Sequence, residues 1–368
     1  MARAPKLEEE RPPYDALDGV PLPRETSILV GHRAAEQTLL DAYRSGRMHH
    51  AWIVAGERGI GKATLACRFA RFVFAHPDPD APEVGAAADL SVAPEHPAAR
   101  RVAVGAHGNL LHLQRDWNEK TGRHRTELLV ESVRRIIPFL GSTASEEGWR
   151  VVIVDTADDM NPNAANAILK NLEEPPKRTL FLLLAERRGA LIPTILSRSR
   201  TLGLDPLSAS ETAEVVRAVA PDAAEGSDAG LAAALAGGSP RRFIELARRN
   251  GVELYRLMRR AIEAGDRPSQ FKLATLASDA ASTAQFLDLF ETYLSRRLRG
   301  VPEPGEGGSS PAVPLVSLAA LWEKAAVSGL EVETYNLDRR QFVLDLLETA
   351  AADFRQAGTG KSGTPNRS

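Results

Sequence analysis

The sequence lacks the residues that would stabilise a chain covalently or anchor it in a membrane. It has one cysteine, Cys67, in 368 residues, which excludes internal disulfides and any zinc site built from several cysteines. No apolar run approaches the roughly 20 residues that span a bilayer. The N-terminal stretch MARAPKLEEERPPYD carries charges and prolines instead of an apolar signal segment. We expect a cytoplasmic protein without bound zinc and without a membrane partner.

A strong net charge is also missing. The formal charge is −2, so the chain as a whole is not a basic nucleic-acid-binding protein. Any contact with DNA must come from a local patch or through partner proteins. The apolar fraction of 43% is sufficient for real hydrophobic cores, and this length predicts two or three domains.

The stretch GERGIGKAT at residues 56–64 lacks one group of a phosphate-binding P-loop, G-x-x-x-x-G-K-[ST]. The cradle residues of that pattern are present: Gly56, Gly59, Gly61 and Lys62. Backbone N–H groups of such a loop face a phosphate, and the lysine neutralises its charge. The next residue normally gives a hydroxyl to Mg²⁺, but here it is Ala63. Thr64 follows about 100° further round the helix, so the pattern predicts a degenerate nucleotide site.

The second half of such a site is also incomplete. The apolar strand in VVIVDTADD ends in Asp155, which is the residue type that organises the metal. The next position commonly holds a glutamate that activates water, and here it holds Thr156, whose hydroxyl is far too weak a base at neutral pH. The neighbouring strand ends in Ala185, where a polar residue is expected. These losses indicate a nucleotide fold whose hydrolytic groups are gone.

The order of apolar runs predicts an α/β fold. Five runs are expected to be strands: 51–56, 110–113, 150–155, 179–185 and 200–204. Helical patterns lie between them, and alternation of this kind is typical of a parallel, doubly wound sheet. Ligands of such sheets bind at the carboxyl ends of the strands, where the P-loop would lie.

Composition predicts the remaining organisation. The expected parts are a flexible N-terminal arm at 1–24, an α/β nucleotide-binding-like domain at 25–206, a helical lid at 207–250, a helical collar at 251–355 and a disordered tail at 356–368. Residues 76–108 are rich in Pro, Ala and Gly and weakly periodic, which predicts a long loop or insertion. Another loop is expected at 300–314.

Three longer stretches resemble the bacterial clamp-loader AAA+ proteins. They are GRMHHAWIVAGERGIGKATLA, NPNAANAILKNLEEPP and LIPTILSRSR, and TYNLDRRQFVLDLLETA near the C-terminus resembles the same family. The resemblance implies a P-loop AAA+ parallel-sheet module with a helical lid, followed by an all-α collar. It also implies a hetero-oligomer that loads a sliding clamp onto primed DNA within a DNA polymerase III holoenzyme. The implied partners are the gamma and tau motor subunits, the delta subunit, the clamp and the DNA.

The resemblance assigns roles to several residues. The family's Ser-Arg-Cys motif falls on Ser197, Arg198 and Ser199, so Arg198 would be an arginine finger that reaches the ATP of a neighbouring subunit. Arg241 or Arg242 would be the lid's sensor arginine. The implied role is that of a stator that hydrolyses no ATP itself.

Alternatives stay open at the level of sequence. The chain would be an active AAA+ ATPase with a relaxed site, or a switch that binds ATP or ADP weakly without turnover, since the glycines and Lys62 are retained. Polar residues around one helix are candidates for contact with duplex DNA: Asn166, Lys170, Asn171, Arg134 and Arg135. Contacts of this kind would be to phosphates and independent of sequence.

Overall fold

Five parallel strands form the central sheet, and they are the five apolar runs predicted from the sequence. The computed structural model describes residues 12–141, 148–304 and 313–359. The strands are β1 (Ala51–Ala55), β2 (Leu110–Leu113), β5 (Arg150–Val154), β6 (Thr179–Ala185) and β7 (Arg200–Gly203). Their order in the sheet is β2-β5-β6-β1-β7, with every pairing parallel. This order brings the ends of β1, β5 and β6 together, and it confirms the predicted α/β fold with a parallel sheet.

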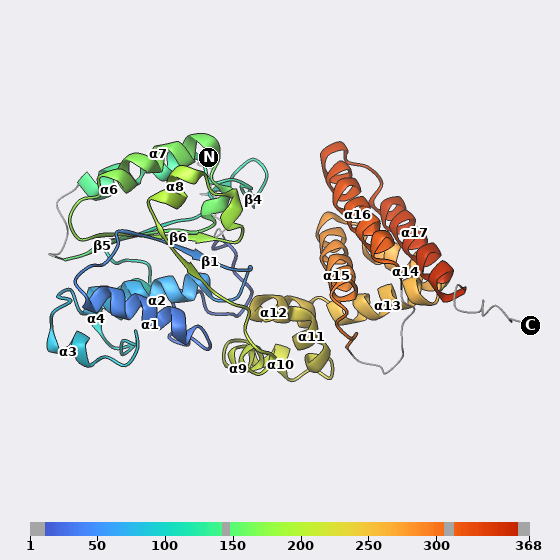
Figure 1. The fold of residues 1–368 in the computed structure, drawn as a ribbon, viewed down its shortest axis with the longest axis horizontal. Coiled ribbons are helices and arrows are strands. Elements are labelled where there is room, and N and C mark those ends of the chain that lie inside the picture. The colour runs from blue at the N-terminus through green and yellow to red at the C-terminus, as the bar shows by residue number, and fades with distance from the viewer. Residues whose placement is uncertain (1–11, 142–147, 305–312, 360–368) are drawn as a thin grey trace, which may run out of the picture. The chain divides into compact units, whose positions relative to one another are not determined.

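Helices cover both faces of the sheet (Figure 1). On one side lie α1 (Arg33–Arg44), α2 (Lys62–Ala75) and α4 (Pro97–Ala103). On the other lie α6 (Ile136–Gly141), α7 (Pro162–Glu173) and α8 (Pro193–Ser197), with α5 (Val130–Arg134) packed against α7. Alternate residues of β1 enter the two cores, Val54 on the α2 side and Ile53 on the α7 side. This two-residue period follows from the alternation of side chains along a strand.

Residues 76–108 are not one long loop, as the sequence had suggested. They contain two short helices, α3 (Pro82–Ala86) and α4, each with a proline in its first turn. Val84, Leu90 and Val102 are completely buried, and α4 packs against α2. The segment is therefore part of the hydrophobic core on that side of the sheet.

A small antiparallel ladder was not predicted. It joins β3 (Trp117–Asn118) and β4 (Arg123–His124), just beyond the carboxyl end of β2. Two residues per strand are too few for an alternating hydrophobic pattern to be visible in the sequence.

The chain divides into two units. The first comprises Met1–Pro221 and Gly237–Arg241, and the second comprises Asp222–Ala236 and Arg242–Ser368. The segment expected to be a lid, 207–250, is thus shared between them. Its helices are α9 (Ala209–Val219), α10 (Pro221–Ala224), α11 (Ala229–Ala236) and α12 (Pro240–Arg248).

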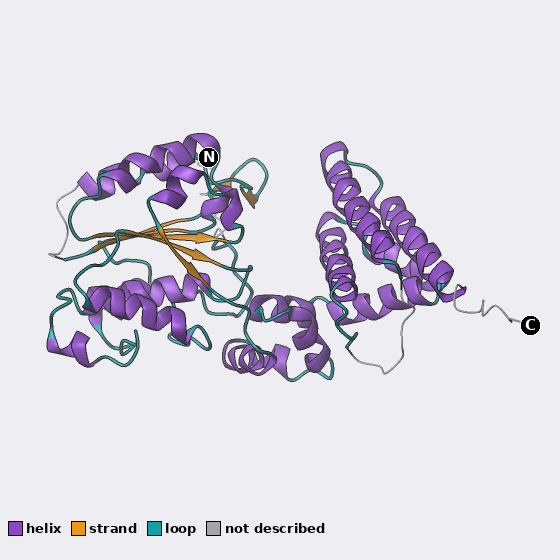
Figure 2. Cartoon of the chain, in the orientation of Figure 1, coloured by secondary structure: helices purple, strands orange, loops and turns teal. Residues whose placement is uncertain are grey.

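Every regular element in the described part of the second unit is a helix (Figure 2). After α12 come α13 (Gly251–Glu263), α14 (Arg267–Leu276), α15 (Ala280–Leu298), α16 (Leu315–Tyr335) and α17 (Arg339–Thr359). α13 packs against α14, α15 and α17, and α16 packs against α15 and α17. Of the expected loop at 300–314, residues 305–312 lie outside the described residues, as do 360–368 of the expected tail. α17 extends four residues into that tail. No helix among the described residues is long and apolar enough to cross a membrane.

Candidate nucleotide site

The P-loop connects β1 to α2 at the carboxyl edge of the sheet. Gly61 caps α2 with a φ of 116°, and Gly59 has a φ of 75°. A Cβ atom on Gly59 would lie 2.4 Å from the Cβ of Arg241, and one on Gly56 would lie 2.8 Å from the carbonyl oxygen of Leu204. These two glycines are therefore required by close approach of neighbouring segments as well as by any ligand.

Lys62 is turned into its own loop. Its Nζ donates to the carbonyl oxygens of Gly56 at 2.7 Å and Glu57 at 2.8 Å, and the residue is only 9% exposed. Burial lowers the pKa of Lys62, and the negative charges of nearby carboxylates, first of all Glu186, oppose that shift. In this state the ammonium group donates its hydrogen bonds to carbonyl oxygens of the loop.

Two further loop carbonyls accept hydrogen bonds from residues outside the loop. Ser239 Oγ donates to the carbonyl oxygen of Arg58 at 2.8 Å, and His32 Nε2 donates to that of Ile60 at 2.7 Å. The loop is thus held by His32, which directly precedes α1, and by Ser239, which directly precedes α12. Thr64 lies half-buried in the first turn of α2, directly after Ala63.

Asp155 lies where β5 ends, as predicted, and it faces one polar side chain of β2 and another just after that strand. His112 Nε2 is 3.7 Å from its Oδ2, and Gln114 Nε2 donates to the same oxygen at 3.5 Å. Burial alone would raise the pKa of Asp155, but His112, Gln114 and the charge of Lys62 outweigh it and lower the pKa. Asp155 is therefore a stable carboxylate beside the cradle.

The residue directly after Asp155 is a threonine and not a carboxylate. Thr156 takes the left-handed conformation, with φ 55° and ψ 51°, and its Oγ1 donates to the carbonyl oxygen of Asp155 at 2.7 Å. Asp158 accepts from the backbone N–H groups of Glu186 and Arg187 at 3.2 and 2.9 Å. This aspartate fixes the turn after β6.

Glu186 is a carboxylate that sequence reasoning missed. It directly follows Ala185 at the end of β6. Burial raises the pKa of Glu186, and the charges of Lys62 and Arg58 oppose that shift. Its position one residue after a strand end was the available signal, because the ends of neighbouring parallel strands meet at one edge.

Part of the expected flexible arm contacts the cradle. Asp15 Oδ1 lies 2.5 Å from Arg58 Nη2 and 3.0 Å from Arg241 Nη2. Arg241 thus lies beside the P-loop, because it shares the Asp15 carboxylate with Arg58 of that loop. Within the second unit, Arg242 Nη2 pairs with Asp288 Oδ2 at 2.8 Å. Only the first of the two sensor candidates reaches the cradle.

Arg198 follows α8 and is partnered by that helix and α7. Its Nη2 lies 2.7 Å from Glu173 Oε1, and its Nη1 donates to the Thr194 carbonyl oxygen at 3.0 Å and to Ser197 Oγ at 3.3 Å. The side chain is 35% exposed. The guanidinium is therefore held at a partly open surface position.

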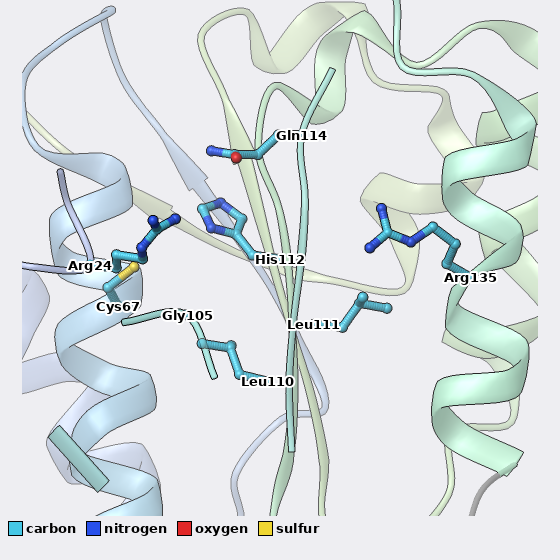
Figure 3. Close-up of a pocket in the computed structure, with 8 residues that line it drawn as sticks. All are labelled: Arg24, Cys67, Gly105, Leu110, Leu111, His112, Gln114 and Arg135. Carbon is cyan, nitrogen blue, oxygen red and sulfur yellow. The ribbon is translucent and has the colours of Figure 1, made fainter. Parts of the chain in front are cut away.

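A cavity of about 230 Å³ lies at the edge strand β2 (Figure 3). Arg24, Cys67 and His112 lie on one side of the strand, and Leu111 and Arg135 lie on the other. Cys67 is fully buried, and burial raises the pKa of its thiol to about 12. Such a thiol is inert. Among the described residues, no group of three or more His, Cys, Asp or Glu side chains is arranged to hold a metal ion.

The surface suggested for DNA is partly exposed. Arg134, Arg135, Asn166 and Lys170 are exposed, and Asn171 is half-buried. The opposite side of α7 is buried against the sheet through Ala164, Ile168 and Leu172.

The family model and the curated relatives that match this chain are subunits of DNA polymerase III. The model described as DNA polymerase III, delta subunit, matches residues 31–208. The DNA polymerase III subunit delta' of Pseudomonas aeruginosa is 34% identical over 192 residues, 52% of this chain and 53% of that protein. The subunit delta' of Bacillus subtilis is 31% identical over 169 residues, 46% of each chain. The subunit gamma of Buchnera aphidicola (Schizaphis graminum) is 26% identical over 188 residues, 50% of this chain and 46% of that one. The chain spans about half the length of the curated relatives it matches.

Solved structures with a similar fold are more distant. A Thermotoga maritima RuvB variant has a TM-score of 0.39 at 19% identity and covers 92% of both chains. The Aeropyrum pernix ORC1 protein in complex with DNA has a TM-score of 0.42 at 13% identity, covering 90% of this chain and 95% of that one. The fold assignment rests on the strand order and not on these values.

Proposed function

Because residues 31–208 belong to the DNA polymerase III clamp-loader family, we propose that this protein is a delta prime subunit of the clamp loader. In this role it hydrolyses no ATP, acts as a stator, and supplies Arg198 to the ATP site of a neighbouring motor subunit. The curated matches carry both delta' and gamma names, so the choice between a stator and a motor rests on the site itself.

The observation that carries the proposal is the residue after Asp155. A motor subunit needs a base at this position to activate water. Thr156 is not such a base, and its hydroxyl donates a hydrogen bond to the carbonyl oxygen of Asp155. Ala63 also removes the hydroxyl that would hold Mg²⁺. A phosphate cradle without either group is suited to a structural role.

The surroundings of Arg198 favour a role in trans. The guanidinium is partly exposed and held by Glu173 and α8. Arginine keeps its charge when desolvated and bonds two phosphate oxygens at once, so it suits the stabilisation of a phosphoryl-transfer transition state. Glu173 would orient it until a neighbour's ATP takes its place.

The proposed partners follow from the family. They are the gamma and tau motor subunits and the delta subunit, and through them the sliding clamp and primed DNA. Arg134, Arg135, Asn166, Lys170 and Asn171 are the proposed contacts to DNA phosphates, and such contacts weaken as salt concentration rises.

A second candidate is an active ATPase. Glu186 favours it, because burial raises the pKa of this carboxyl and it lies within the electrostatic reach of Lys62. A carboxylate with a raised pKa is the kind of group that acts as a general base. In this version Glu186 replaces the missing glutamate after Asp155. A switch that binds ATP or ADP without turnover is intermediate between the two functions.

Steady-state ATPase of the purified chain separates these functions. We expect a rate equal to the buffer background, with or without Mg²⁺ and primed DNA. Turnover that disappears in both Lys62→Ala and Glu186→Gln would instead establish the ATPase. Saturable nucleotide binding without turnover would establish the switch.

A further inference from the structure

Residues 12–20, here called the strap, lie against the nucleotide site of the same unit. The strap is folded by local turns, with Ala16 N–H donating to the carbonyl oxygen of Pro13 at 3.2 Å and Val20 N–H to that of Leu17 at 3.1 Å. Asp15 takes the left-handed conformation, with φ 57°. A non-glycine residue in that region is uncommon and is usually held by its surroundings.

Two arginines hold Asp15 from opposite parts of the chain. Arg58, in the middle of the P-loop, places Nη2 2.5 Å from Asp15 Oδ1. Arg241, at the start of α12, places Nη2 3.0 Å from the same oxygen, and its Nη1 donates to the Asp15 backbone carbonyl at 2.5 Å. One carboxylate oxygen is therefore shared between two guanidinium groups.

The neighbouring Tyr14 covers the Asp155 side of the site. Its ring lies under the guanidinium carbon of Arg115 at 5.7 Å and edge-on to His124 at 5.3 Å. Burial raises the pKa of Tyr14 to about 12; the charges of Asp15 and Asp155 add to this rise, whereas the charge of Arg115 and a hydrogen bond with Thr156 oppose it. His124 Nε2 also donates to the carbonyl oxygen of Pro12 at 3.0 Å.

These contacts place the strap between the P-loop and the Asp155 turn, the two halves of a nucleotide site. We propose that the strap is a built-in occupant of this site, and that the Asp15 carboxylate takes the position between Arg58 and Arg241 that a phosphate group of a nucleoside triphosphate would take. Carboxylates and phosphates are both bound by arginine through charge-assisted hydrogen bonds. Asp15 is thus the residue that keeps polyphosphates out.

The orientation of Lys62 is consistent with an anion site that the Asp15 carboxylate of the same chain occupies. With Asp15 seated on the two arginines, Lys62 donates to loop carbonyls and its ammonium group makes no direct bond to the strap carboxylate. The Asp15 charge still acts on Lys62 from a distance. An entering phosphate would have to displace Asp15 and turn Lys62 outward.

The strap can be displaced because its ion pairs are partly exposed. The side chains of Asp15 and Arg58 are 32% and 54% exposed, and exposed ion pairs contribute little individually. A nucleotide would therefore bind only to the open fraction, and its apparent dissociation constant would be raised in proportion. The strap occupies the chain's own P-loop, so its displacement by a nucleotide is independent of what Arg198 does in trans.

The test is titration of the full chain with a fluorescent ATP analogue. Asp15→Asn removes the charge that competes with phosphate and keeps the size of the side chain. We expect the variant to bind the analogue about three- to tenfold more tightly than the wild type, since the apparent dissociation constant falls in proportion as the open fraction rises. Asp41→Asn is the matched control, because it breaks a surface ion pair with Arg44 on α1 and should bind like the wild type.

Competition with inorganic triphosphate shows which part of the nucleotide the opened site binds. Displacement by triphosphate and by ATP at similar concentrations assigns the site to the phosphate chain alone. Displacement only by ATP means that the nucleoside contributes as well, and both results support a phosphate site under the strap. A double variant, Tyr14→Ala with Asp15→Asn, removes both anchors of the strap. If neither variant binds the analogue more tightly than wild type, and their circular dichroism shows an intact fold, the proposal is wrong.

Discussion

At the scale of single residues, Gly59 explains why the cradle persists without its hydrolytic groups. Its φ is 75°, and a Cβ would lie 2.6 Å from Ser239 Oγ and 2.4 Å from the Cβ of Arg241. The loop is a packing element between β1, α2 and the start of α12. Its sequence is therefore constrained by the fold, whether or not a nucleotide binds.

Gly59→Ala is expected to lower the free energy of unfolding by about 2–4 kcal/mol, the sum of left-handed strain and overpacking. Gly85→Ala in α3 is the control, because no atom lies within 4 Å of a Cβ built there and its φ is not positive. That change should be neutral or stabilise by about 0.5–1 kcal/mol. Urea denaturation of both variants gives the comparison, and equal effects would show that the loop is not held by packing.

Asp155 predicts a pH dependence. Its pKa in the folded state is lower than the ordinary value of about 3.9, so the unfolded chain binds the proton more tightly. The stability due to this carboxylate is therefore present above about pH 4 and is lost as the pH falls through the folded pKa. The difference in urea midpoint between wild type and Asp155→Asn should shrink below about pH 4. A constant difference down to pH 3 would contradict the account.

At the scale of elements, the segment 76–108 is the clearest test of packing. Leu90 is fully buried, and its backbone N–H donates to Glu36 Oε1 on α1 at 3.0 Å. Leu90→Ala should destabilise the first unit by about 2–5 kcal/mol, because it leaves a cavity beside α1 and α2. Val104→Ala, at a residue 73% exposed, should change stability by less than about 0.5 kcal/mol. If Leu90→Ala is as mild, the segment is an insertion outside the core.

The sequence predicted elements whose signals are local. Each of the five sheet strands is a compact apolar run, and α12 begins at Pro240, a residue type that favours the first turn of a helix. The helices α3 and α4 were missed because they are only 5 and 7 residues long, too short to show a helical period in the sequence. Their helical state depends on packing against α2, which no local pattern reveals.

The site was predictable only in part, for a similar reason. Gly56, Lys62 and Asp155 belong to short patterns, so their positions followed from the strands. The contact of Asp15 with Arg241 joins residues 226 apart in the chain. Glu186 stands next to a strand end, but only the fold shows that its charge acts on Lys62. The inward turn of Lys62 depends on which carbonyls lie within its reach.

At the scale of the whole molecule, α16 presents an apolar stripe that the described residues do not cover. Val316, Val327 and Leu330 are 81%, 51% and 67% exposed, and their spacing puts them on one side of the helix. Exposed apolar stripes of this kind mark protein interfaces. In a collar domain the stripe would be covered by another subunit.

Val316→Ser with Leu330→Ser should therefore weaken assembly with the motor subunits by at least about tenfold, because each buried anchor contributes about 1 kcal/mol or more to binding. Thermal unfolding of the isolated chain should not change, since both side chains already face solvent. Val104→Ser is a control at an exposed valine of the first unit. Full-affinity assembly of the double variant, measured by light scattering, would show that α16 lies outside the interface.

We infer that this chain contributes to ATP hydrolysis through Arg198 and not through its own P-loop. The most direct measurement is the DNA- and clamp-stimulated ATPase of the reconstituted assembly, with turnover counted for each site. Arg198→Ala should leave assembly intact and slow one motor site by roughly 10³-fold or more, Arg198→Lys should restore little of it, and Lys62→Ala should leave every site active. Unchanged turnover in the Arg198→Ala assembly, or loss of one site's turnover in the Lys62→Ala assembly, would contradict the account.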